Sequence, residues 1–188
     1  TLRVDVLPFE KINGRKVYHV RGIAKSNDFF SMIYKINDVV DSYFDFESFF
    51  SHKLHIVIDE TKQTRDSIEL NDVEEAKTFY WDRWTHWKKG FKELKKRRKI
   101  PRFAQDTVSA AFYLRTLDFS EATPVHRFPV VSEGKWFEAE VSFVRREMLM
   151  TSMGKIPSIV LKPVTRHRGI LKPTGDSYLW ISDDPNRH

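Results

Sequence analysis

The sequence contains no cysteine and little glycine or proline. Without cysteine, the 188-residue chain can hold no disulfide framework, thiol nucleophile or cysteine-ligated zinc ion. Seven glycines and eight prolines are too few for a collagen-like or low-complexity chain. No run of 18 apolar residues occurs, so the sequence predicts no membrane-spanning helix. The glycine motifs of phosphate-binding loops, dinucleotide-binding folds and serine hydrolases are also missing.

Aromatic and basic side chains are what the chain has in excess. It contains 15 Phe, 6 Tyr and 5 Trp, and 40 % of its residues are hydrophobic, which suits a folded domain rather than a disordered chain. Ten Lys or Arg and one Glu fall between residues 83 and 102, a net charge of +9. Since the whole chain carries +6, all other residues together carry −3. The basic character therefore belongs to one short segment.

Apolar and polar residues alternate with a period of two along most of the chain. Asn13-Gly14 lies between two alternating runs and is the strongest short signal for a β-hairpin turn. Ser132-Glu133-Gly134 marks a second hairpin turn. Further strands are expected over residues 34–44, 52–59, 64–70, 126–131, 135–146, 156–164 and 178–182. This spacing predicts a mainly β, antiparallel fold, either an open barrel or a strongly curved sheet.

One segment breaks the rhythm of strands. Residues 105–117 place apolar side chains at helical spacing and offer Asp106 or Thr107 as a cap, so we expect one central helix there. Residues 27–33 resemble a short helical turn capped by Asn27 or Asp28. No internal repeat and no Ser/Gly linker occurs. We therefore expect a single β domain over residues 1–188, with residues 80–102 as a basic-aromatic insertion.

The basic-aromatic segment is the main candidate for binding. As a helix, residues 80–102 would present a stripe of aromatic side chains with cations around it, as an interfacial membrane helix does. As a strand and loop, the segment would place Trp81 and Trp87 on one face and Trp84 on the other. Both alternatives stay open. The candidate binding residues are Trp81, Trp84, Trp87, Lys88, Lys89, Lys95, Lys96, Arg97 and Arg98.

The partner expected for this segment is an anionic lipid or glycan. Nucleic acid would use the same charges, but the sequence contains no recognisable nucleic-acid-binding module, so we disfavour it. In the plainest interpretation, the aromatic side chains belong to the core and the lysines face water. A second expectation concerns the phenylalanines around two loops, which could form a rim or an exposed patch. They are Phe29, Phe30, Phe44, Phe46, Phe49 and Phe50.

Other candidate sites are weak. His52 and His55 form an H-x-x-H pair, but a strand at these residues would point them to opposite faces, so we predict no metal and no cofactor. Ser109 fits a capping role better than that of a nucleophile. Asp183 and Asp184 are adjacent and would point apart, and Pro185 after them favours a turn. No catalytic residue is predicted.

The order of these features resembles the bacterial domain-of-unknown-function family 3108. The resemblance runs from Asn-Gly-Arg-Lys-Val-Tyr-His-Val at residues 13–20 to Leu-Trp-Ile-Ser-Asp-Asp-Pro-Asn-Arg at residues 179–187. The segments between them that match are residues 24–26, 34–38, 41–45, 105–110 and 113–115. The segment from Trp81 to Arg102 is longer and more basic than the family pattern. Relatives carry a further strand before Thr1 and another after His188, so we expect trimming at both ends.

The resemblance implies an exported, periplasmic or envelope-associated protein with an antiparallel β fold that curls into an open barrel. It implies no particular reaction, so we favour a non-enzymatic protein that binds an envelope component or supports envelope assembly. The alternative is a hydrolase of an envelope polymer that uses acids such as Asp38, Asp183 or Asp184. Family features also fall at Asp106, Arg115 and Asp183, where we expect structural polar pairing. An exposed edge strand could take a protein partner.

Overall fold

The computed structural model describes residues 1–152, 154–165, 177–185 and 187. Asn186, part of the last segment of the family resemblance, lies outside these residues. The chain forms two compact units, one of Thr1–Ser109 with Val131–Trp136 and one of Ala110–Val130 with Phe137–His188. Each unit is described by itself. The expectation of one domain with an insertion at residues 80–102 stays a prediction.

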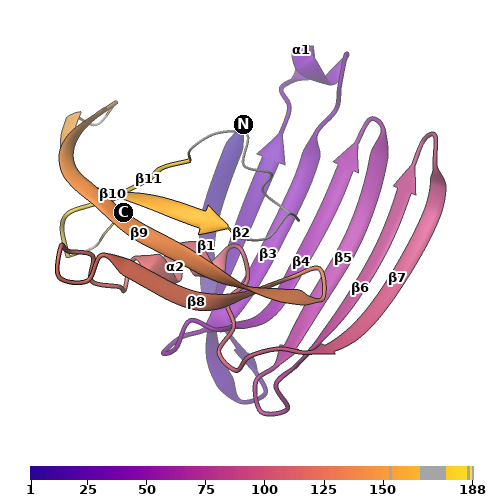
Figure 1. Cartoon of the computed structure of the whole chain (residues 1–188). Coiled ribbons are helices and arrows are strands. Elements are labelled where there is room, and N and C mark those ends of the chain that lie inside the picture. Colours follow the sequence, from indigo (N-terminus) through magenta and orange to yellow (C-terminus); the bar gives the residue numbers. More distant parts are fainter. Residues whose placement is uncertain (153, 166–176, 186, 188) are drawn as a thin grey trace. The chain divides into compact units, whose positions relative to one another are not determined.

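The first unit is built on a seven-stranded antiparallel sheet whose strands pair in chain order (Figure 1). The sheet curls as a half-barrel, which confirms the predicted fold class. Its strands are β1 (Leu2–Ile12), β2 (Arg15–Lys25), β3 (Asn37–Asp45), β4 (Ser51–Glu60), β5 (Gln63–Asp72), β6 (Lys77–His86) and β7 (Gly90–Lys99).

Two predicted turns are confirmed at the residues that favour them. Asn13 and Gly14 connect β1 and β2 with φ angles of 50° and 79°, the positive values that a two-residue hairpin turn needs. Helix α1 (Asp28–Ser31) follows β2, and the Asn27 side chain caps it by accepting a hydrogen bond from the Phe30 N–H. No residue of α1 is buried.

One face of the seven-stranded sheet carries the core of the first unit. The register places Val20, Ser42, Leu54, Glu69 and Tyr80 in one row across five strands, and all five side chains are buried. Two other segments contact the strands of this sheet. Ala104, after β7, accepts the Ser51 N–H at 3.0 Å, and Gly134, in the hairpin tip at residues 131–136, donates its N–H to Glu69 at 2.7 Å. Ile100, Ala104 and Val131 form the apolar cluster there. Polar side chains thus occupy part of the interior row.

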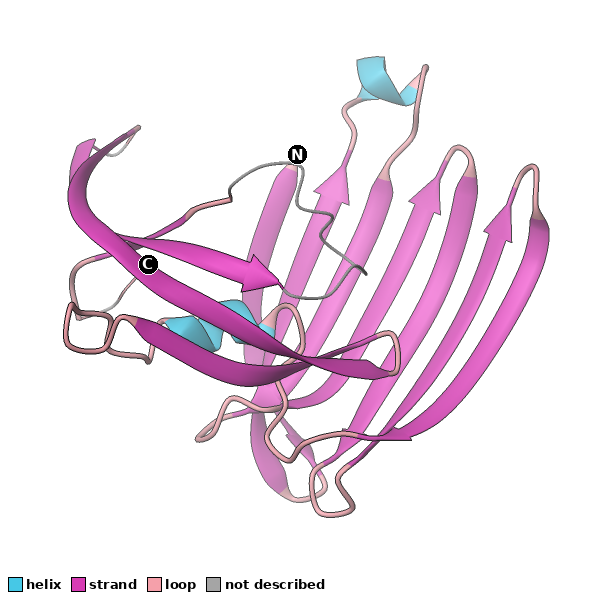
Figure 2. Ribbon diagram, viewed as in Figure 1, coloured by secondary structure: helices cyan, strands magenta, loops and turns pink. Residues whose placement is uncertain are grey.

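The second unit contains a four-stranded antiparallel sheet (Figure 2). Its order is β11 (Leu179–Ser182), β10 (Gly154–Thr165), β9 (Lys135–Thr151) and β8 (Val125–Ser132). Its buried core side chains are Leu114, Phe119, Phe128, Val130, Val141, Ile159, Leu161 and Ile181. No helix in the part of the chain described here is long and apolar enough to cross a membrane.

The helical alternative for residues 80–102 is wrong. All ten residues of β6 pair with β5 on one side and with β7 on the other, so backbone hydrogen bonds to neighbouring strands replace those of a helix.

The central helix is shorter than residues 105–117. Helix α2 spans Ser109–Leu114, because the Asp106 side chain accepts the N–H groups of Val108 and Ser109 and folds the preceding residues into a turn. After Leu114, hydrogen bonds between residues three apart close the helix, from the N–H groups of Arg115, Thr116 and Leu117.

Candidate binding surface

The predicted binding residues all lie on the β6–β7 hairpin, but on different sides of it. Strand alternation places Trp81, Lys95 and Arg97 on one face of the sheet. Trp84, Lys96 and Arg98 lie on the opposite face. Trp87, Lys88 and Lys89 form the turn between the strands. The structure therefore brings the nine residues into one hairpin without gathering the three tryptophans on one face.

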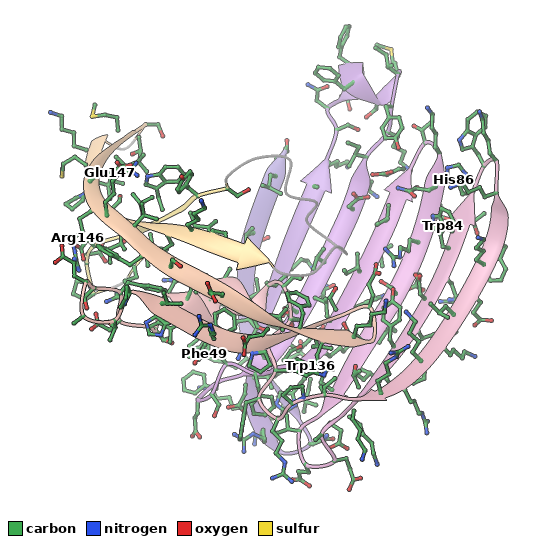
Figure 3. The ribbon with its side chains drawn as sticks, viewed as in Figure 1. Phe49, Trp84, His86, Trp136, Arg146 and Glu147 are labelled. Atoms are coloured by element: carbon green, nitrogen blue, oxygen red, sulfur yellow. The ribbon has the colours of Figure 1, made fainter. Side chains whose placement is uncertain are left out.

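Trp87 is the most exposed tryptophan of the hairpin, with 61 % of its surface accessible. Its ring lies 6.5 Å from that of His86. The His86 ring lies 5.4 Å from that of Trp84, and Figure 3 labels both residues. The strand-and-loop alternative expected Trp87 on the same face as Trp81. Trp87 instead lies in the turn, outside both strands, so it does not share a strand face with Trp81. The ammonium groups of Lys88 and Lys62 lie 4.6 Å and 5.9 Å from the Trp87 ring centroid. Such pairs hold cations beside an exposed aromatic ring.

Several cations in the body of the hairpin already have partners within the protein. The Lys96 ammonium donates to the Glu133 carbonyl oxygen at 3.0 Å and lies over the Tyr80 ring. Lys95 lies over the Trp81 ring, whose indole N–H donates to Glu93 at 2.6 Å. Some of the basic side chains of β7 therefore contact groups of the protein itself and stabilise the edge of the sheet. Nine of the ten residues of β7 are exposed, and the turn continues this exposed surface at the end of the hairpin.

The helix α1 loop exposes a second group of large apolar side chains. Phe29, Phe30, Met32 and Ile33 are between 60 % and 77 % exposed. Soluble proteins seldom expose several neighbouring apolar side chains without a partner that covers them. Of the six phenylalanines around two loops that could form a rim or an exposed patch, Phe29 and Phe30 lie in this loop. The other four lie at the β3–β4 connection, where Phe44 and Phe50 are buried and Phe46 and Phe49 are half-buried.

Hydrogen bonds join three turns at one end of the seven-stranded sheet. In a consecutive antiparallel sheet, the β2–β3, β4–β5 and β6–β7 connections share one end, the upper one in Figure 1. Thr61 donates its N–H to the Lys35 carbonyl at 3.1 Å, and its hydroxyl accepts the Lys35 N–H at 2.6 Å. Trp87 donates its N–H to the Lys62 carbonyl at 3.0 Å.

These contacts make the three turns one continuous surface, which we call the apolar–basic end. It comprises Phe29, Phe30, Met32, Ile33, Lys62, Trp87, Lys88 and Lys89. The sequence identified the last three as binding residues, and it included Phe29 and Phe30 among six phenylalanines that could form a rim or an exposed patch. It gave no signal for Met32, Ile33 or Lys62, because the order of the strands is what places their turns at the same end of the sheet as Trp87.

The predicted structural polar residues have identifiable contacts. Asp106 is fully buried, accepts the Ser42 hydroxyl at 2.8 Å and caps the start of α2, and burial raises the pKa of its carboxyl group. The Arg115 guanidinium lies 5.6 Å from the Phe112 ring centroid. Asp183 accepts a hydrogen bond from Arg146 Nε at 2.8 Å. Asp106 therefore links the start of α2 to strand β3.

The acids of the hydrolase alternative are held in separate surroundings. Asp38 lies in the first unit, where it accepts the Asp59 N–H at 3.2 Å. Asp183 and Asp184 lie in the second unit, and Asp184 accepts the Arg187 N–H at 3.0 Å. Each carboxylate thus contacts donors of its own unit.

The two histidines of the H-x-x-H pair face different carboxylates. His55 Nε2 lies 2.8 Å from Asp66, whereas His52 Nε2 lies 3.7 Å from Asp45. Within the described residues, no three His, Asp or Glu side chains gather as ligands for a metal ion.

Glu69 is a buried acid that the sequence did not single out. Its side chain is 2 % exposed, and Oε1 accepts the Gly134 N–H at 2.7 Å and the Thr78 hydroxyl at 3.3 Å. Burial raises the pKa of Glu69 to about 7, although these two hydrogen bonds oppose the shift. A glutamate within a polar–apolar alternation looks like a solvent-facing residue, so only the packing of the hairpin tip reveals its burial.

Comparison with known proteins identifies the family and nothing narrower. No curated protein and no solved structure matches the chain. The family model described as "Protein of unknown function (DUF3108)" matches residues 1–188, the whole chain, and the chain therefore belongs to this family.

Proposed function

We propose that this protein is a non-enzymatic component of the bacterial cell envelope that binds an anionic lipid surface through its apolar–basic end. One observation carries the proposal: three hydrogen-bonded turns present five exposed apolar side chains together with three lysines. The five are Phe29, Phe30, Met32, Ile33 and Trp87. The envelope location, periplasmic in the family resemblance, is part of the proposal.

The composition of this end suits the boundary between lipid headgroups and acyl chains. Full burial of one large apolar side chain contributes about 1.5–3 kcal/mol, so a few inserted side chains are enough for reversible attachment. Tryptophan favours the headgroup level, where the Trp87 ring would sit. Each of the lysines 62, 88 and 89 adds about 1 kcal/mol near an anionic membrane surface. Since α1 buries no residue, folding alone does not explain its apolar side chains.

A glycan is a weaker candidate for this surface than a lipid. Lysines alone would suit an acidic glycan, but Met32 and Ile33 provide flexible or branched apolar groups that a sugar ring does not need. Strand β7 is also a poor site for edge-to-edge pairing with a protein, because six of its ten residues are Lys or Arg. The opposite edge strand, β1, exposes Leu2, Val4 and Val6 and is the better place for a protein partner.

Sedimentation with lipid vesicles tests the proposal. We expect the protein to co-sediment with vesicles of phosphatidylcholine and phosphatidylglycerol, more weakly at high salt, and little with phosphatidylcholine alone. The apolar variant is Phe30→Ser with Ile33→Ser, and its control is Phe103→Ser, which removes an equally exposed aromatic side chain outside this end. The apolar variant should lose binding and the control should keep it.

A matched pair of charge variants tests the lysines. Changing Lys62, Lys88 and Lys89 to Gln should weaken binding to the anionic vesicles by about 100-fold, as three lost lysine contacts predict. In the control, Lys53, Lys77 and Lys99 are changed to Gln, so the net charge falls by the same amount. These three lysines lie toward the other ends of their strands. Equal loss in both variants would show that net charge alone drives binding. Equal sedimentation with neutral and anionic vesicles would contradict the proposal.

A further inference from the structure

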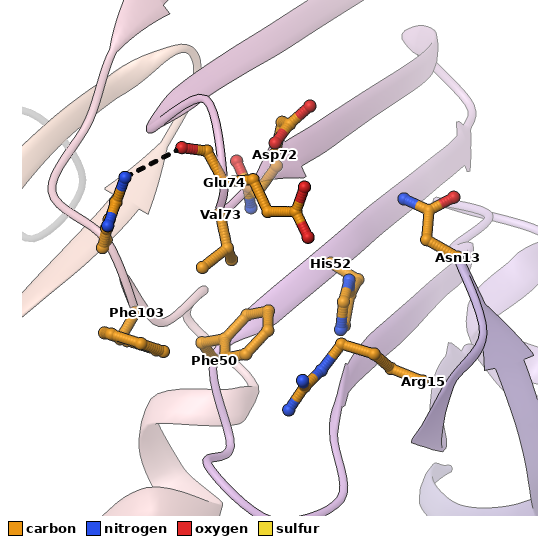
Figure 4. A pocket seen from close by; sticks show the side chains of 10 residues that line it. Asn13, Arg15, Phe50, His52, Asp72, Val73, Glu74 and Phe103 are labelled. Carbon is orange, nitrogen blue, oxygen red and sulfur yellow. Dashed lines mark hydrogen bonds between the residues drawn. The ribbon is translucent and has the colours of Figure 1, made fainter.

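A pocket opens at the other end of the seven-stranded sheet, among the β1–β2, β3–β4 and β5–β6 connections. Its volume is about 740 Å³, within the range of pockets that hold small organic ligands. The whole pocket lies in the first unit. Figure 4 shows side chains from all three connections around it. The lining residues that the argument uses are Arg15, His52, Asn71, Asp72, Glu74, Arg102 and Phe103.

Asn71 supplies a buried amide that the protein itself does not satisfy. The residue is 7 % exposed, and neither Oδ1 nor Nδ2 has a hydrogen-bond partner among the residues that the structure describes. Buried side-chain polar atoms are nearly always hydrogen-bonded, since leaving one without a partner destabilises the fold. Because the Asn71 side chain lines the pocket, a bound molecule could satisfy both atoms, one as a donor and one as an acceptor.

His52 adds a second buried polar group to the pocket wall. It is also 7 % exposed, and Nε2 forms no hydrogen bond to any described residue, with Asp45 Oδ2 beyond reach at 3.7 Å. Burial lowers the pKa of His52, which keeps the imidazole neutral. A neutral imidazole offers one donor and one acceptor, as the amide does.

The charged groups around the pocket balance one another. Arg15 Nε donates to Asp45 at 2.6 Å, and this pair holds the pKa of Asp45 at about 2. The Arg102 guanidinium donates to the Glu74 carbonyl oxygen at 3.2 Å. The carboxylates of Asp72 and Glu74 stand on the same wall. An anion would meet these carboxylates, and a cation would meet Arg15 and Arg102, so neither is favoured.

Phe103 provides an apolar surface opposite the polar groups. It is 55 % exposed, and its ring packs edge-on against that of Phe50 at 5.6 Å. Its φ angle of +60° is in the left-handed region, which is unfavourable for a bulky residue. Strain of this kind recurs at sites where a side chain must be presented in a fixed direction.

We infer that this pocket binds a neutral, hydroxyl-rich molecule of the saccharide class. The Asn71 amide and the His52 imidazole would take neighbouring hydroxyl groups, and the Phe103 ring would cover an apolar face of the sugar ring. The site is independent of the lipid surface proposed above, because it shares no residue with the apolar–basic end.

Amide-resolved NMR titration of the whole chain tests this inference. The probes are D-glucose, N-acetylglucosamine, myo-inositol and, as the competing anion, inorganic phosphate. We expect at least one of the three neutral compounds to shift the Asn71 side-chain NH₂ and the Glu74 and Phe103 backbone resonances in a saturable way. Phosphate should not. Saturable shifts from phosphate alone would overturn the neutral class, and no saturable shift from any neutral probe would overturn the site.

Three variants separate recognition from folding. Asn71→Leu replaces the unsatisfied amide by an apolar side chain of similar size, so the urea midpoint of unfolding should stay the same or rise. Sugar affinity should fall about tenfold, because one pair of hydrogen bonds to the ligand is lost. Phe103→Gly suits the positive φ angle and should fold while weakening binding severalfold. Thr64→Val, on the same strand but the opposite face from Asn71, is the control and should bind as the parent does. Unchanged affinity in both Asn71→Leu and Phe103→Gly would refute the inference.

Discussion

Glu69 should make the stability of the first unit fall as the pH rises toward neutrality. Its carboxyl group is buried in the interior row of the sheet, and burial raises its pKa from an ordinary 4.5 to about 7. Between these two pH values the folded protein holds a proton that the unfolded chain releases. Because the folded state then binds more protons, stability is greatest below pH 4.5 and decreases up to about pH 7.

The size of this effect follows from the pKa difference. Each pKa unit is equivalent to about 1.4 kcal/mol, so the shift of Glu69 corresponds to about 3 kcal/mol of stability lost between pH 4 and pH 8. The substitution Glu69→Gln removes the titration but keeps an oxygen that can accept the Gly134 N–H. The free energy of unfolding of the variant relative to the parent should therefore rise by about 3 kcal/mol across this interval.

Urea unfolding followed by tryptophan fluorescence, at several pH values from 4 to 8, measures this difference. The buried Asp106 carboxyl also has a raised pKa and adds a decrease of the same sign to both proteins. Most of this Asp106 contribution cancels when the variant is compared with the parent; the part that remains is the repulsion between the two carboxylates, which also raises the pKa of Glu69. A difference between the two proteins that stays constant with pH would refute the assignment of a protonated, buried Glu69. If the unfolding free energy of the variant relative to the parent fell as the pH rises, the predicted direction of the pH dependence would be refuted.

Three further substitutions test the packing and the electrostatics of the same unit. At Gly134 (φ +69°) a Cβ atom would lie 3.0 Å from Tyr80 Cβ, whereas at Gly14 (φ +79°) nothing lies within 4 Å. Gly134→Ala should therefore cost about 2–4 kcal/mol and Gly14→Ala about 1 kcal/mol in urea unfolding, and equal losses would contradict the close approach. Hydrogen bonds from Arg15 and from the N–H groups of Ser48 and Glu47 lower the pKa of Asp45 to about 2. The ionised carboxylate therefore stabilises the fold above pH 3.8, and this contribution is lost as the pH falls toward 2. Asp45→Asn should cost about 2 kcal/mol at pH 7 and little at pH 2, so a cost that persists at pH 2 would argue against stabilisation by the ionised Asp45 carboxylate.

Local signals in the sequence were enough to place most of the strands. The alternation of residues and the Asn13-Gly14 pair predicted hairpins that the structure confirms, because a side-chain period of two and a turn with positive φ are properties of a few adjacent residues. They could not distinguish helix from strand at residues 80–102. There the aromatic side chains repeat every three or four residues, which fits a helical face, while pairing with β5 fixes the strand. That pairing is a long-range interaction.

The candidate surfaces show the same division between local and long-range information. Trp87, Lys88 and Lys89 attract attention in the sequence because they are adjacent in it. Lys62 joins them only through the hydrogen bond between its carbonyl group and the Trp87 N–H. Asn71 looks like an ordinary polar residue at the end of a strand. Its importance comes from burial without a partner, which depends on the packing of the connections around it.

The order of the strands keeps the two proposed sites apart and makes them independently testable. In a consecutive antiparallel sheet, alternate connections lie at opposite ends, so the apolar–basic end and the Asn71 pocket are separated by the length of the strands. A ten-residue strand such as β5 spans about 33 Å. A protein attached to a vesicle by Phe30 and Trp87 would therefore keep its pocket open to water, away from the lipid. Sugar binding should be the same with and without anionic vesicles, and the Asn71→Leu variant should sediment with them as the parent does. A sugar affinity that changes on vesicles would mean that the sheet transmits binding from one end to the other.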